Sequence, residues 1–575
     1  MKKLLYIFAF CLMAAVIYSC AGSDGLEEVT EGAGKTEESV YQDVNDTRKV
    51  VYDLYGRVRE LKGANHGTFS RLKTMNTCVA LLDNATDDGI GEMGSTVAGI
   101  VKYVTGSISA TSNPVVDTHP WTWYYTAIRQ ANGFLENVDA SVLEATEKAH
   151  LKAEARFLRA YYYHELYRWF GRFVILDHRV DPFDKSLKRA TEKECVDWLI
   201  GEFDALIAPG SGLQDVPESN YYGIATRGAA YAYKARTLLY AASPLHADAG
   251  SGATWAQAAQ AAKDMIDWSD DNGYYDLYVD PSNPAMSYAH LFNTRYNNEY
   301  IFWYNNADAN DIYHLFPPVN PWNVNKELAS QATVGFVDSY DMIDGTSPFI
   351  YDEYGHNLGA NPACTTYDPD HPYDNRDPRL DQTILHDGMT WPLVGGSPCT
   401  LDISTKEKWV AGHFICKFLD ERVDHIAGGK VTMNFPCMRF AEMLLDYAEA
   451  INETANTPAV RAEAAAALNR IRNRAGITTP LDPSEFTQKE MRIKIRQERR
   501  IELSWEEHRF FDIRRWKIAN VVMNESVKGI TKDAATGKYS FIQYGKRTYS
   551  PRMDLSPIPV KDVNQCPGID QNPGY

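Results

Sequence analysis

Apolar side chains recur at steps of three and four residues along much of the chain, the spacing that places them on one face of a helix. The clearest run, 151–170, stops at Gly171, a residue suited to the turn after a helix. We therefore predict a mainly α fold. The same spacing predicts further helices at 40–61, 121–135, 192–206, 225–242, 255–268, 439–452, 462–474 and 491–505.

Several of these predicted helices follow one another in pairs joined by short turns. In the pair 225–242 and 255–268, and again in 439–452 and 462–474, alanines stand where two helices would approach closely. Small side chains allow such packing, and helix pairs of this length are typical of tetratricopeptide-like repeats. The sequence lacks the full repeat signature, so an irregular helical bundle of similar composition is the alternative.

Between the two groups of pairs, residues 273–435 have a different pattern. Pro, Asn, Asp and aromatic residues dominate, and short extended runs such as 300–304 alternate with turn signals. We predict a loop-rich subdomain inserted into a helical scaffold that covers about 40–272 and 436–575. Loops held by a rigid scaffold are common places for binding sites.

The beginning of the chain has the pattern of an export signal. Two lysines precede an apolar stretch that is too short to cross a bilayer, as in a signal peptide. The stretch ends in Ile-Tyr-Ser-Cys at 17–20, which resembles a bacterial lipobox. We predict a signal peptide at 1–19 and acylation of Cys20, which would anchor the protein stably through its lipid. Ordinary secretory cleavage, with Cys20 incidental, is the alternative.

Residues 20–39 link this anchor to the rest of the chain. They lack aromatic residues and large aliphatic clusters and are rich in Glu, Gly and Thr, so they predict a flexible acidic tether. This acidic stretch resembles the one that follows the lipidated cysteine in surface-exported lipoproteins of Bacteroidetes. The body, 40–575, would then hang from the membrane.

Composition changes this picture in three respects. The net charge of −18 repels phosphate backbones and disfavours a nucleic-acid partner. The 35 Tyr and 12 Trp supply flat apolar faces with polar edges that suit stacking on sugars, although many of them will fill contacts between helices. No two of the nine cysteines have CxxC spacing, so we predict no thiolate metal site. Without Cys11 and Cys20 an odd number remains, and the disulfide pairing stays open.

Six motifs are spread along the body in a fixed order. They lie at 153–163 (AEARFLRAYYY), 375–380 (NRDPRL), 439–450 (RFAEMLLDYAEA), 469–476 (NRIRNRAG), 498–516 and 557–575. Together with the lipobox, they resemble the SusD/RagB family of nutrient-uptake outer-membrane lipoproteins. The resemblance implies four tetratricopeptide-like units, glycan capture, and a position as a lid on a SusC-type TonB-dependent transporter. Some relatives take up peptides instead.

The charged residues of the fifth motif could be mistaken for an active site. Glu498, Arg499, Arg500 and Glu502 lie within one or two turns of a predicted helix, a geometry for ion pairs inside that helix. The surrounding arginines alternate with acids, whereas a nucleic-acid reader needs an uncompensated basic face. We therefore predict a structural role for these charges.

Catalytic motifs are missing from the sequence. We find no GxSxG, HExxH, P-loop or GxGxxG in a suitable context, and we predict that the protein is not an enzyme and takes no cofactor. Asp83, Asp87 and Asp88 do not match an EF-hand loop, so we assign no metal site, and whether calcium binds stays open.

The best candidate for a ligand platform is the segment 303–322. Its aromatic residues lack helical spacing, and three prolines exclude a helix. Sugar rings stack on Trp and Tyr, and their hydroxyls bond to amides and acids. Trp121 lies on an apolar helical stripe and is predicted to be core. The predicted ligand-binding residues are Trp303, Tyr304, Asn310, Asp311, Tyr313 and Trp322, with Trp391 as a second location.

These patterns support one functional hypothesis and two alternatives. The first is an outward-facing, lipid-anchored outer-membrane protein that captures an oligo- or polysaccharide and delivers it to a SusC-type transporter. The second is the same arrangement with a peptide as cargo. The third is a structural envelope scaffold without a small-molecule ligand.

Overall fold

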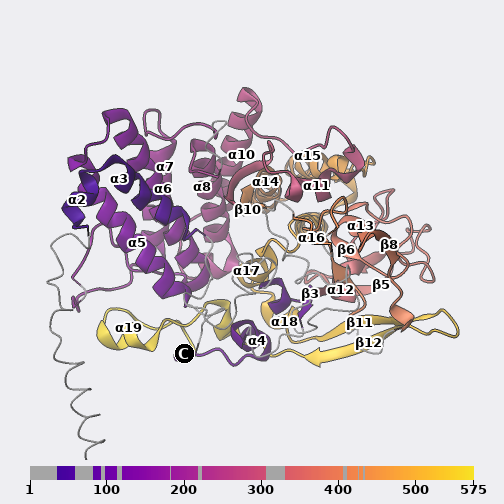
Figure 1. The fold of residues 1–575 in the computed structure, drawn as a ribbon. Helices are drawn as coiled ribbons and strands as arrows, with labels where there is room; N and C mark the ends of the chain where they lie inside the picture. The colour runs from indigo at the N-terminus through magenta and orange to yellow at the C-terminus, as the bar shows by residue number, and fades with distance from the viewer. Residues whose placement is uncertain are drawn as a thin grey trace, which may run out of the picture.

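The computed structural model describes most of the body of the chain. In Figure 1 the long helices extend from the left through the centre to the upper right, and most of the strands lie at lower right. Within the described ranges, no helix combines the length and apolar character that a membrane crossing requires. The described residues are 35–58, 82–91, 98–112, 119–181, 183–217, 223–305, 330–405, 411–424, 427–430 and 434–575.

The scaffold is a succession of long helices, each packed against the next along the chain. Contacts join α5 to α6, α6 to α7, α7 to α8 and α8 to α10, and α10 then packs against α14. The predicted mainly α fold is confirmed. The long helices are α3 (Val44–Tyr55), α5 (Pro120–Asn137), α6 (Ala145–Phe170), α7 (Glu192–Ile207), α8 (Arg227–Ala242), α10 (Trp255–Asn272), α14 (Phe440–Thr454), α15 (Pro458–Arg474) and α16 (Gln488–Glu502).

Shorter helices complete the scaffold and the inserted region. They are α2 (Glu37–Tyr41), α4 (Ala98–Thr105), α9 (Pro244–Asp248), α11 (Ser287–Asn293), α12 (Val334–Asp338), α13 (Arg379–Thr383), α17 (His508–Arg515), α18 (Ala519–Val522) and α19 (Val560–Gln565). The helix predicted at 40–61 is therefore divided into α2 and α3. The break follows from Asp43, whose side chain accepts a hydrogen bond from the Asp46 amide and caps the start of α3.

Local sequence signals set the ends of the long helices. Thr191, Thr254 and Thr487 form capping boxes at the starts of α7, α10 and α16, which satisfy amides that have no partner inside the helix. Helix α6 ends at Gly171, where φ is +68°, as the sequence predicts.

The alanine-rich pair α8 and α10 packs closely. Ala229, Ala232 and Ala235 on α8 are fully buried, and so are Ala258 and Ala262 on α10 to within 1%. Side chains of this size let the two backbones approach, which confirms the predicted packing of the pair.

The first described helix is fastened to the scaffold by charges. Arg179 contacts Glu37 at 2.5 Å and Glu136 at 2.6 Å. Since α2 begins at Glu37, the last three residues of the predicted tether are helical. The predicted lipidation site, Cys20, lies outside the described residues.

The inserted region leaves and rejoins the scaffold through one antiparallel ribbon. Strand β2 (Tyr300–Asn305) pairs with β10 (Asn434–Arg439), so that Tyr304 lies opposite Phe435. The extended run predicted at 300–304 is confirmed. Because α10 precedes this region and α14 follows it directly, the two ends of the insertion come together beside packed helices. We refer to the β2–β10 ribbon as the neck.

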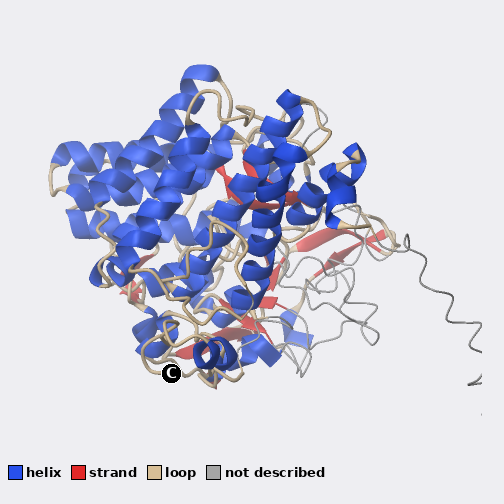
Figure 2. Ribbon diagram, turned by 90° about the vertical axis from the view of Figure 1, so that its left-hand side faces the viewer, coloured by secondary structure: helices blue, strands red, loops and turns tan. Residues whose placement is uncertain are grey.

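The remaining strands form one small sheet and three hairpins (Figure 2). A four-stranded antiparallel sheet has the order β1-β3-β9-β6, and it joins an N-terminal strand to the inserted region. Three hairpins, β4–β5, β7–β8 and β11–β12, are two-stranded. The strands are β1 (Gly89–Gly91), β3 (Ser330–Ala332), β4 (Phe349–Tyr351), β5 (Asn357–Ala360), β6 (Ile384–Leu385), β7 (Thr390–Val394), β8 (Ser397–Thr400), β9 (Phe414–Ile415), β11 (Ser526–Lys532) and β12 (Tyr539–Lys546).

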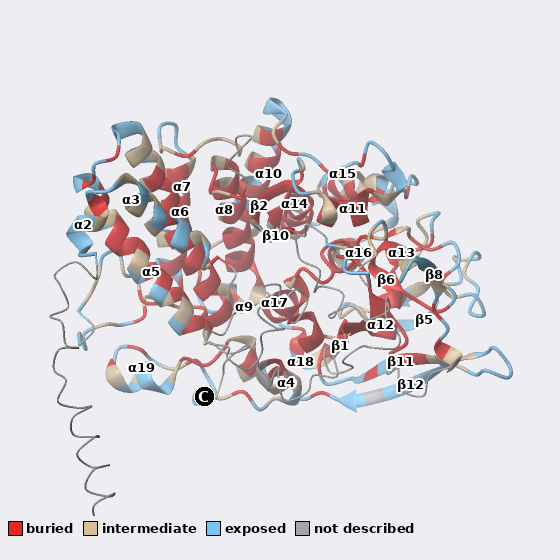
Figure 3. Cartoon of the chain, viewed as in Figure 1, coloured by how far each residue is buried: buried red, intermediate tan, exposed pale blue. Residues whose placement is uncertain are grey.

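Two large hydrophobic clusters form the interior. One follows the helical scaffold and includes Trp121, which is 3% exposed and core, as predicted. The other lies in the inserted region and reaches Ile501 and Trp505 at the end of α16. In Figure 3, α8, α14 and α17 are mostly buried, whereas α19 at the edge of the molecule is not.

The charges of the fifth motif that lie on α16 are buried, and their partners lie on other elements. Arg499 contacts Asp446 on α14 at 2.6 Å and Asp512 on α17 at 2.9 Å. Glu498 contacts Arg379 on α13 at 2.6 Å. The predicted structural role is confirmed, but the prediction of ion pairs within the helix is wrong. These side chains on α16 face neighbouring elements, which supply their partners, whereas on α17 Arg515 pairs with Asp512 of the same helix at 2.8 Å.

Six cysteines lie in the described residues and none forms a disulfide there. Cys195 and Cys416 are buried in apolar surroundings, while Cys364 is half-buried at the surface of the inserted region. The six are Cys195, Cys364, Cys399, Cys416, Cys437 and Cys566.

Candidate ligand-binding site

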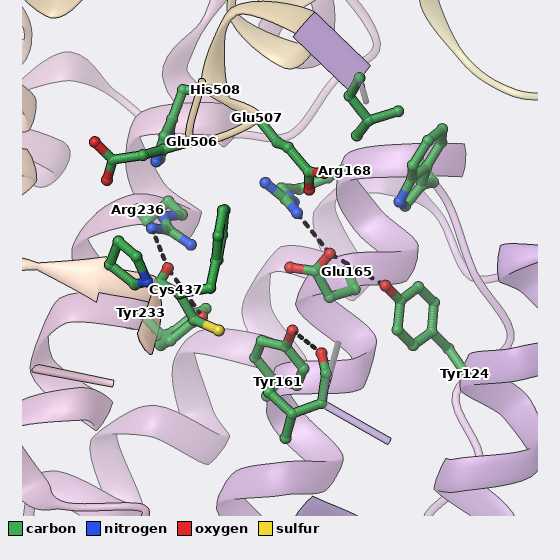
Figure 4. Close-up of a pocket in the computed structure, with 15 residues that line it drawn as sticks. Tyr124, Tyr161, Glu165, Arg168, Tyr233, Arg236, Cys437, Glu506, Glu507 and His508 are labelled. Atoms are coloured by element: carbon green, nitrogen blue, oxygen red, sulfur yellow. Dashed lines mark hydrogen bonds and ion pairs between the residues drawn. The ribbon is translucent and has the colours of Figure 1, made fainter. Parts of the chain in front are cut away.

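A polar pocket lies where the scaffold meets the neck (Figure 4). Its walls come from α5, α6, α8, β10 and the turn that precedes α17. Val58 and Leu82, the described residues on either side of 59–81, also line it. The cavity measures about 50 Å³, which holds a few water molecules or one polar substituent of a ligand, but not a sugar ring.

One wall is a row of polar side chains on α6. Tyr161, Glu165 and Arg168 are spaced by four and three residues, which places them on the same helical face. Glu165 contacts Arg168 at 2.6 Å and accepts a hydrogen bond from the Tyr124 hydroxyl at 3.4 Å. The Arg168 guanidinium lies 4.0 Å from the centre of the Phe511 ring, a cation–π contact that fixes its position.

The opposite wall joins α8 to the neck. Arg236 donates from Nε to Glu442 at 2.6 Å and from Nη2 to the Cys437 carbonyl oxygen at 2.7 Å. The Tyr233 hydroxyl donates to the same carbonyl oxygen at 3.5 Å. The neck is thereby fixed to the scaffold by side chains that also face the pocket.

Burial keeps the tyrosines and the histidine of the pocket un-ionised. It raises the pKa of Tyr124, Tyr161 and Tyr233 well above the ordinary value. Burial, together with Arg236 and Arg499, lowers the pKa of His508 well below its ordinary value, so its imidazole is neutral. The pocket therefore offers neutral phenols and paired charges, which suit hydrogen bonding to hydroxyl groups.

The structure places three of the predicted ligand-binding residues. Trp303 is 3% exposed, and its ring centre lies 5.6 Å from that of Tyr300. Trp391 is 5% exposed, and both tryptophans belong to the cluster of the inserted region. Their rings pack in the core and form no exposed surface. Tyr304 is half-buried and lies across the neck from Phe435, which lines the pocket. Asn310, Asp311, Tyr313 and Trp322 lie outside the described residues.

The pocket residues were not identified from the sequence. Tyr161, Glu165, Arg168 and Arg236 stand on helices that the spacing predicted well, and the first three lie in or beside a family motif. A usable signal was present, because Glu165 and Arg168 continue the same helical face as Tyr161 on a helix that is buried nearly all round. Such charges need partners inside the fold.

Two of the three acids considered for calcium are already engaged in ion pairs. Asp87 contacts Arg509 at 2.7 Å, and Asp88 accepts from Arg500 at 2.6 Å. Over the part of the chain that the structure describes, no group of three His, Cys, Asp or Glu side chains is arranged to hold a metal ion.

Comparison with known families now places the chain. Residues 286–575 match the SusD family, and residues 85–239 match the family described as starch-binding associating with outer membrane. The chain belongs to the SusD family. Its helical scaffold with an inserted region is the architecture of SusD-like structures.

Three relatives illustrate the similarity. SusD-like protein P2 of Formosa agariphila is 25% identical over 487 residues, 80% of this chain and 84% of the relative. A SusD-like protein of Bacteroides fragilis has a solved structure with 26% identity and a TM-score of 0.74, over 94% of this chain and 99% of that one. A SusD-like carbohydrate binding protein of the same species has 22% identity and a TM-score of 0.69, over 92% and 100%.

Proposed function

We propose that this SusD-family protein is a lipid-anchored outer-membrane protein that captures glycans and delivers them to a SusC-type TonB-dependent transporter. The observation that carries the proposal is the pocket at the neck, where Tyr124, Tyr161 and Tyr233 present un-ionised phenols beside paired charges. The description of the matched family as starch-binding supports a carbohydrate ligand, and so does the similarity to a carbohydrate binding protein of Bacteroides fragilis.

The pocket suits the polar part of a sugar rather than the whole ring. Its volume of about 50 Å³ fits a hydroxyl or hydroxymethyl group. Tyr304 lies on the strand from which the chain continues towards Asn310, Asp311, Tyr313 and Trp322. We propose that these residues contact the sugar rings, while Trp303 and Trp391 support them from the core. Stacking contributes about 0.5–1.5 kcal/mol per ring beyond burial, so micromolar or weaker binding is expected.

The test is retention of the protein by glycans in affinity electrophoresis, followed by titration calorimetry. The chain from Cys20 to Tyr575, with Cys20→Ser to keep it soluble, is run against neutral polysaccharides, acidic polysaccharides and peptides. Trp322→Ala should weaken glycan binding about tenfold, the loss expected when one stacked ring is removed. Trp255→Ala, a half-buried residue at the start of α10, is the matched control and should bind normally.

The possible outcomes distinguish glycans from peptides as the cargo and test the place of Trp322 in the site. Glycan binding that is lost in Trp322→Ala supports the proposal, whereas equal binding by both variants removes Trp322 from the site. Binding of peptides alone would replace glycans by peptides as the cargo. No binding to any member of the panel would contradict capture by the isolated protein.

The anchor is tested separately in cells. With Cys20 intact, the protein should incorporate labelled fatty acid and partition with outer membranes, and Cys20→Ala should abolish both. Protease added to whole cells should cleave the body if it faces outward. Labelling that persists in Cys20→Ala would contradict lipidation at this residue.

A further inference from the structure

A second, larger cavity lies on the strand-rich side of the molecule, away from the residues that line the pocket at the neck. It is a groove bounded by the hairpins β4–β5 and β11–β12 and by the helices α12 and α16. Its volume is about 720 Å³, which is in the range of ligand sites for molecules larger than a single sugar. We call it the hairpin groove.

The base of the hairpin groove holds a buried arginine with incomplete bonding. Arg547, the residue after β12, is 5% exposed, and its Nη2 donates to the Gly89 carbonyl oxygen. Its Nη1 is buried and has no hydrogen-bond partner, and no described carboxylate lies within ion-pair distance of the guanidinium. A buried polar group without a partner is costly, and an acceptor on a ligand would remove that cost.

The neighbouring arginines, unlike Arg547, are paired with carboxylates. Arg500 also lines the hairpin groove but is bonded to Asp88, and Arg509 is bonded to Asp87. Burial lowers the pKa of Arg547 to about 10, against the attraction of Asp87 and Asp88. Arg547 therefore stays protonated at neutral pH, lines the groove, and keeps one buried donor that lacks an acceptor in the described chain.

The carboxylates that line the hairpin groove are already engaged. Asp87 is held by Arg509 and Arg500. Asp338 accepts a hydrogen bond from the Asn357 amide at 2.9 Å, and burial raises its pKa. Glu525 contacts His356 at 3.4 Å. An incoming anion would meet Arg547 at the base and Lys528, an exposed cation, at the rim.

The walls are apolar and open to solvent. Leu358 on β5 is 64% exposed, and Phe541 on β12 is 65% exposed, although both are large apolar residues. Phe349 and Tyr367 form an edge-to-face pair in the lining, with ring centres 5.0 Å apart. Apolar and aromatic surface of this kind packs on the C–H faces of sugar rings.

We propose that the hairpin groove is a second binding site of this protein, specific for an acidic sugar whose carboxylate or sulfate group bonds to Arg547. The sugar ring lies between the walls of Leu358 and Phe541. This inference rests on the proposed function, because it names the class of glycan captured. A guanidinium is suited to the task, since it donates in a planar fork that matches both anionic groups.

The experiment compares Arg547→Gln with Lys538→Gln in the full chain from Cys20 carrying Cys20→Ser. Gln at 547 keeps a polar amide but has no charge. Lys538 is exposed at the turn of the same hairpin and outside the groove lining, so its variant matches the charge change. Calorimetry uses three probes: an oligogalacturonate, a sulfated neutral oligosaccharide and its unsulfated form. The thermal midpoint of each variant shows that it is folded.

Arg547→Gln should weaken binding of at least one anionic probe by about tenfold or more, the loss of a charge-assisted bond, and leave the neutral probe unchanged. The probe that responds tells carboxylate from sulfate. Equal affinities in both variants would overturn the groove site while leaving glycan capture intact. If the wild-type protein binds none of the glycans, both proposals are overturned, whether or not it binds peptides. If Arg547→Gln fails to fold, Leu358→Asp with Phe541→Asp, both on exposed positions, provides the same test from the walls.

Discussion

Replacing Glu502 with Gln removes one negative charge from the centre of the buried ion network. Glu502 is fully buried and accepts hydrogen bonds from Arg379 at 2.8 Å, from Arg439 at 2.7 Å and from Arg474. The variant leaves three guanidinium groups around a neutral amide, and Arg379 and Arg439 are themselves almost completely buried. Breaking a buried ion pair costs about 3–5 kcal/mol, so we expect the free energy of unfolding to fall by that amount.

The assay is urea unfolding followed by far-UV circular dichroism, with Glu144→Gln as the matched control. Glu144 is exposed at the start of α6, and its side chain makes no capping bond, so its replacement should change stability by less than about 0.5 kcal/mol. Equal urea midpoints for Glu502→Gln and Glu144→Gln, with the same dependence of the unfolding free energy on urea concentration, would refute this expectation. The ionised network would then not stabilise the fold.

The pH dependence supplies a second check on the same residue. Burial opposes ionisation of Glu502, but Arg474, Arg439 and Arg379 hold its pKa well below the usual value. Its contribution is therefore complete above the pKa of an unfolded glutamate, about 4.3, and is lost as the pH falls further. The stability difference between wild type and Glu502→Gln should be constant near neutral pH and narrow below about pH 4.3. A difference that widens on acidification would contradict the sign of this argument.

Two further predictions concern packing and thiol chemistry. Gly228→Ala should destabilise the protein by about 1–3 kcal/mol, because the added Cβ would lie 2.6 Å from the Tyr275 ring. Gly201→Ala, which has open space around it, should stabilise the protein by up to about 1 kcal/mol. The thermal midpoint should therefore fall in the first variant and rise in the second. With a thiol reagent at pH 8, Cys364 should react in the native protein, because hydrogen bonds to its thiol outweigh its partial burial and lower its pKa. Burial raises the pKa of Cys195 to about 12, so Cys195 should be protected until the protein unfolds. Mass spectrometry that finds Cys195 labelled before Cys364 would contradict this order of thiol reactivity.

The sequence predicts the scaffold well because helix periodicity is a local property. The long helices, the stop at Gly171 and the extended run of the neck all follow from residues close together in the chain. The partners of the buried charges do not follow from nearby residues in the chain. Arg500 and Asp88 are 412 residues apart, and no local pattern connects them. A buried arginine and a solvated one have the same sequence signature until the fold is known.

The candidate site shows the same limit. Trp303 stands in an apolar strand whose two faces are both covered, so alternation along the strand could not show which aromatic ring is open to solvent. The bonding of Arg547 depends on Gly89, which is brought to it by the four-stranded sheet and its neighbours. Such groups are recognised only once segments distant in the chain have been placed together.

The distribution of the buried charges has a consequence for how the chain acquires its structure during synthesis. A ribosome makes Asp87, Asp88, Asp446 and Glu449 before it makes the arginines of α16 and α17 that neutralise them. An incomplete chain holds carboxylates that cannot be buried alone, because an unpaired interior charge is too costly. We therefore expect the core to close only after the C-terminal part has been made. If the chain is exported as we propose, this late arrival would keep it unfolded and able to cross a membrane until nearly all of it has been made.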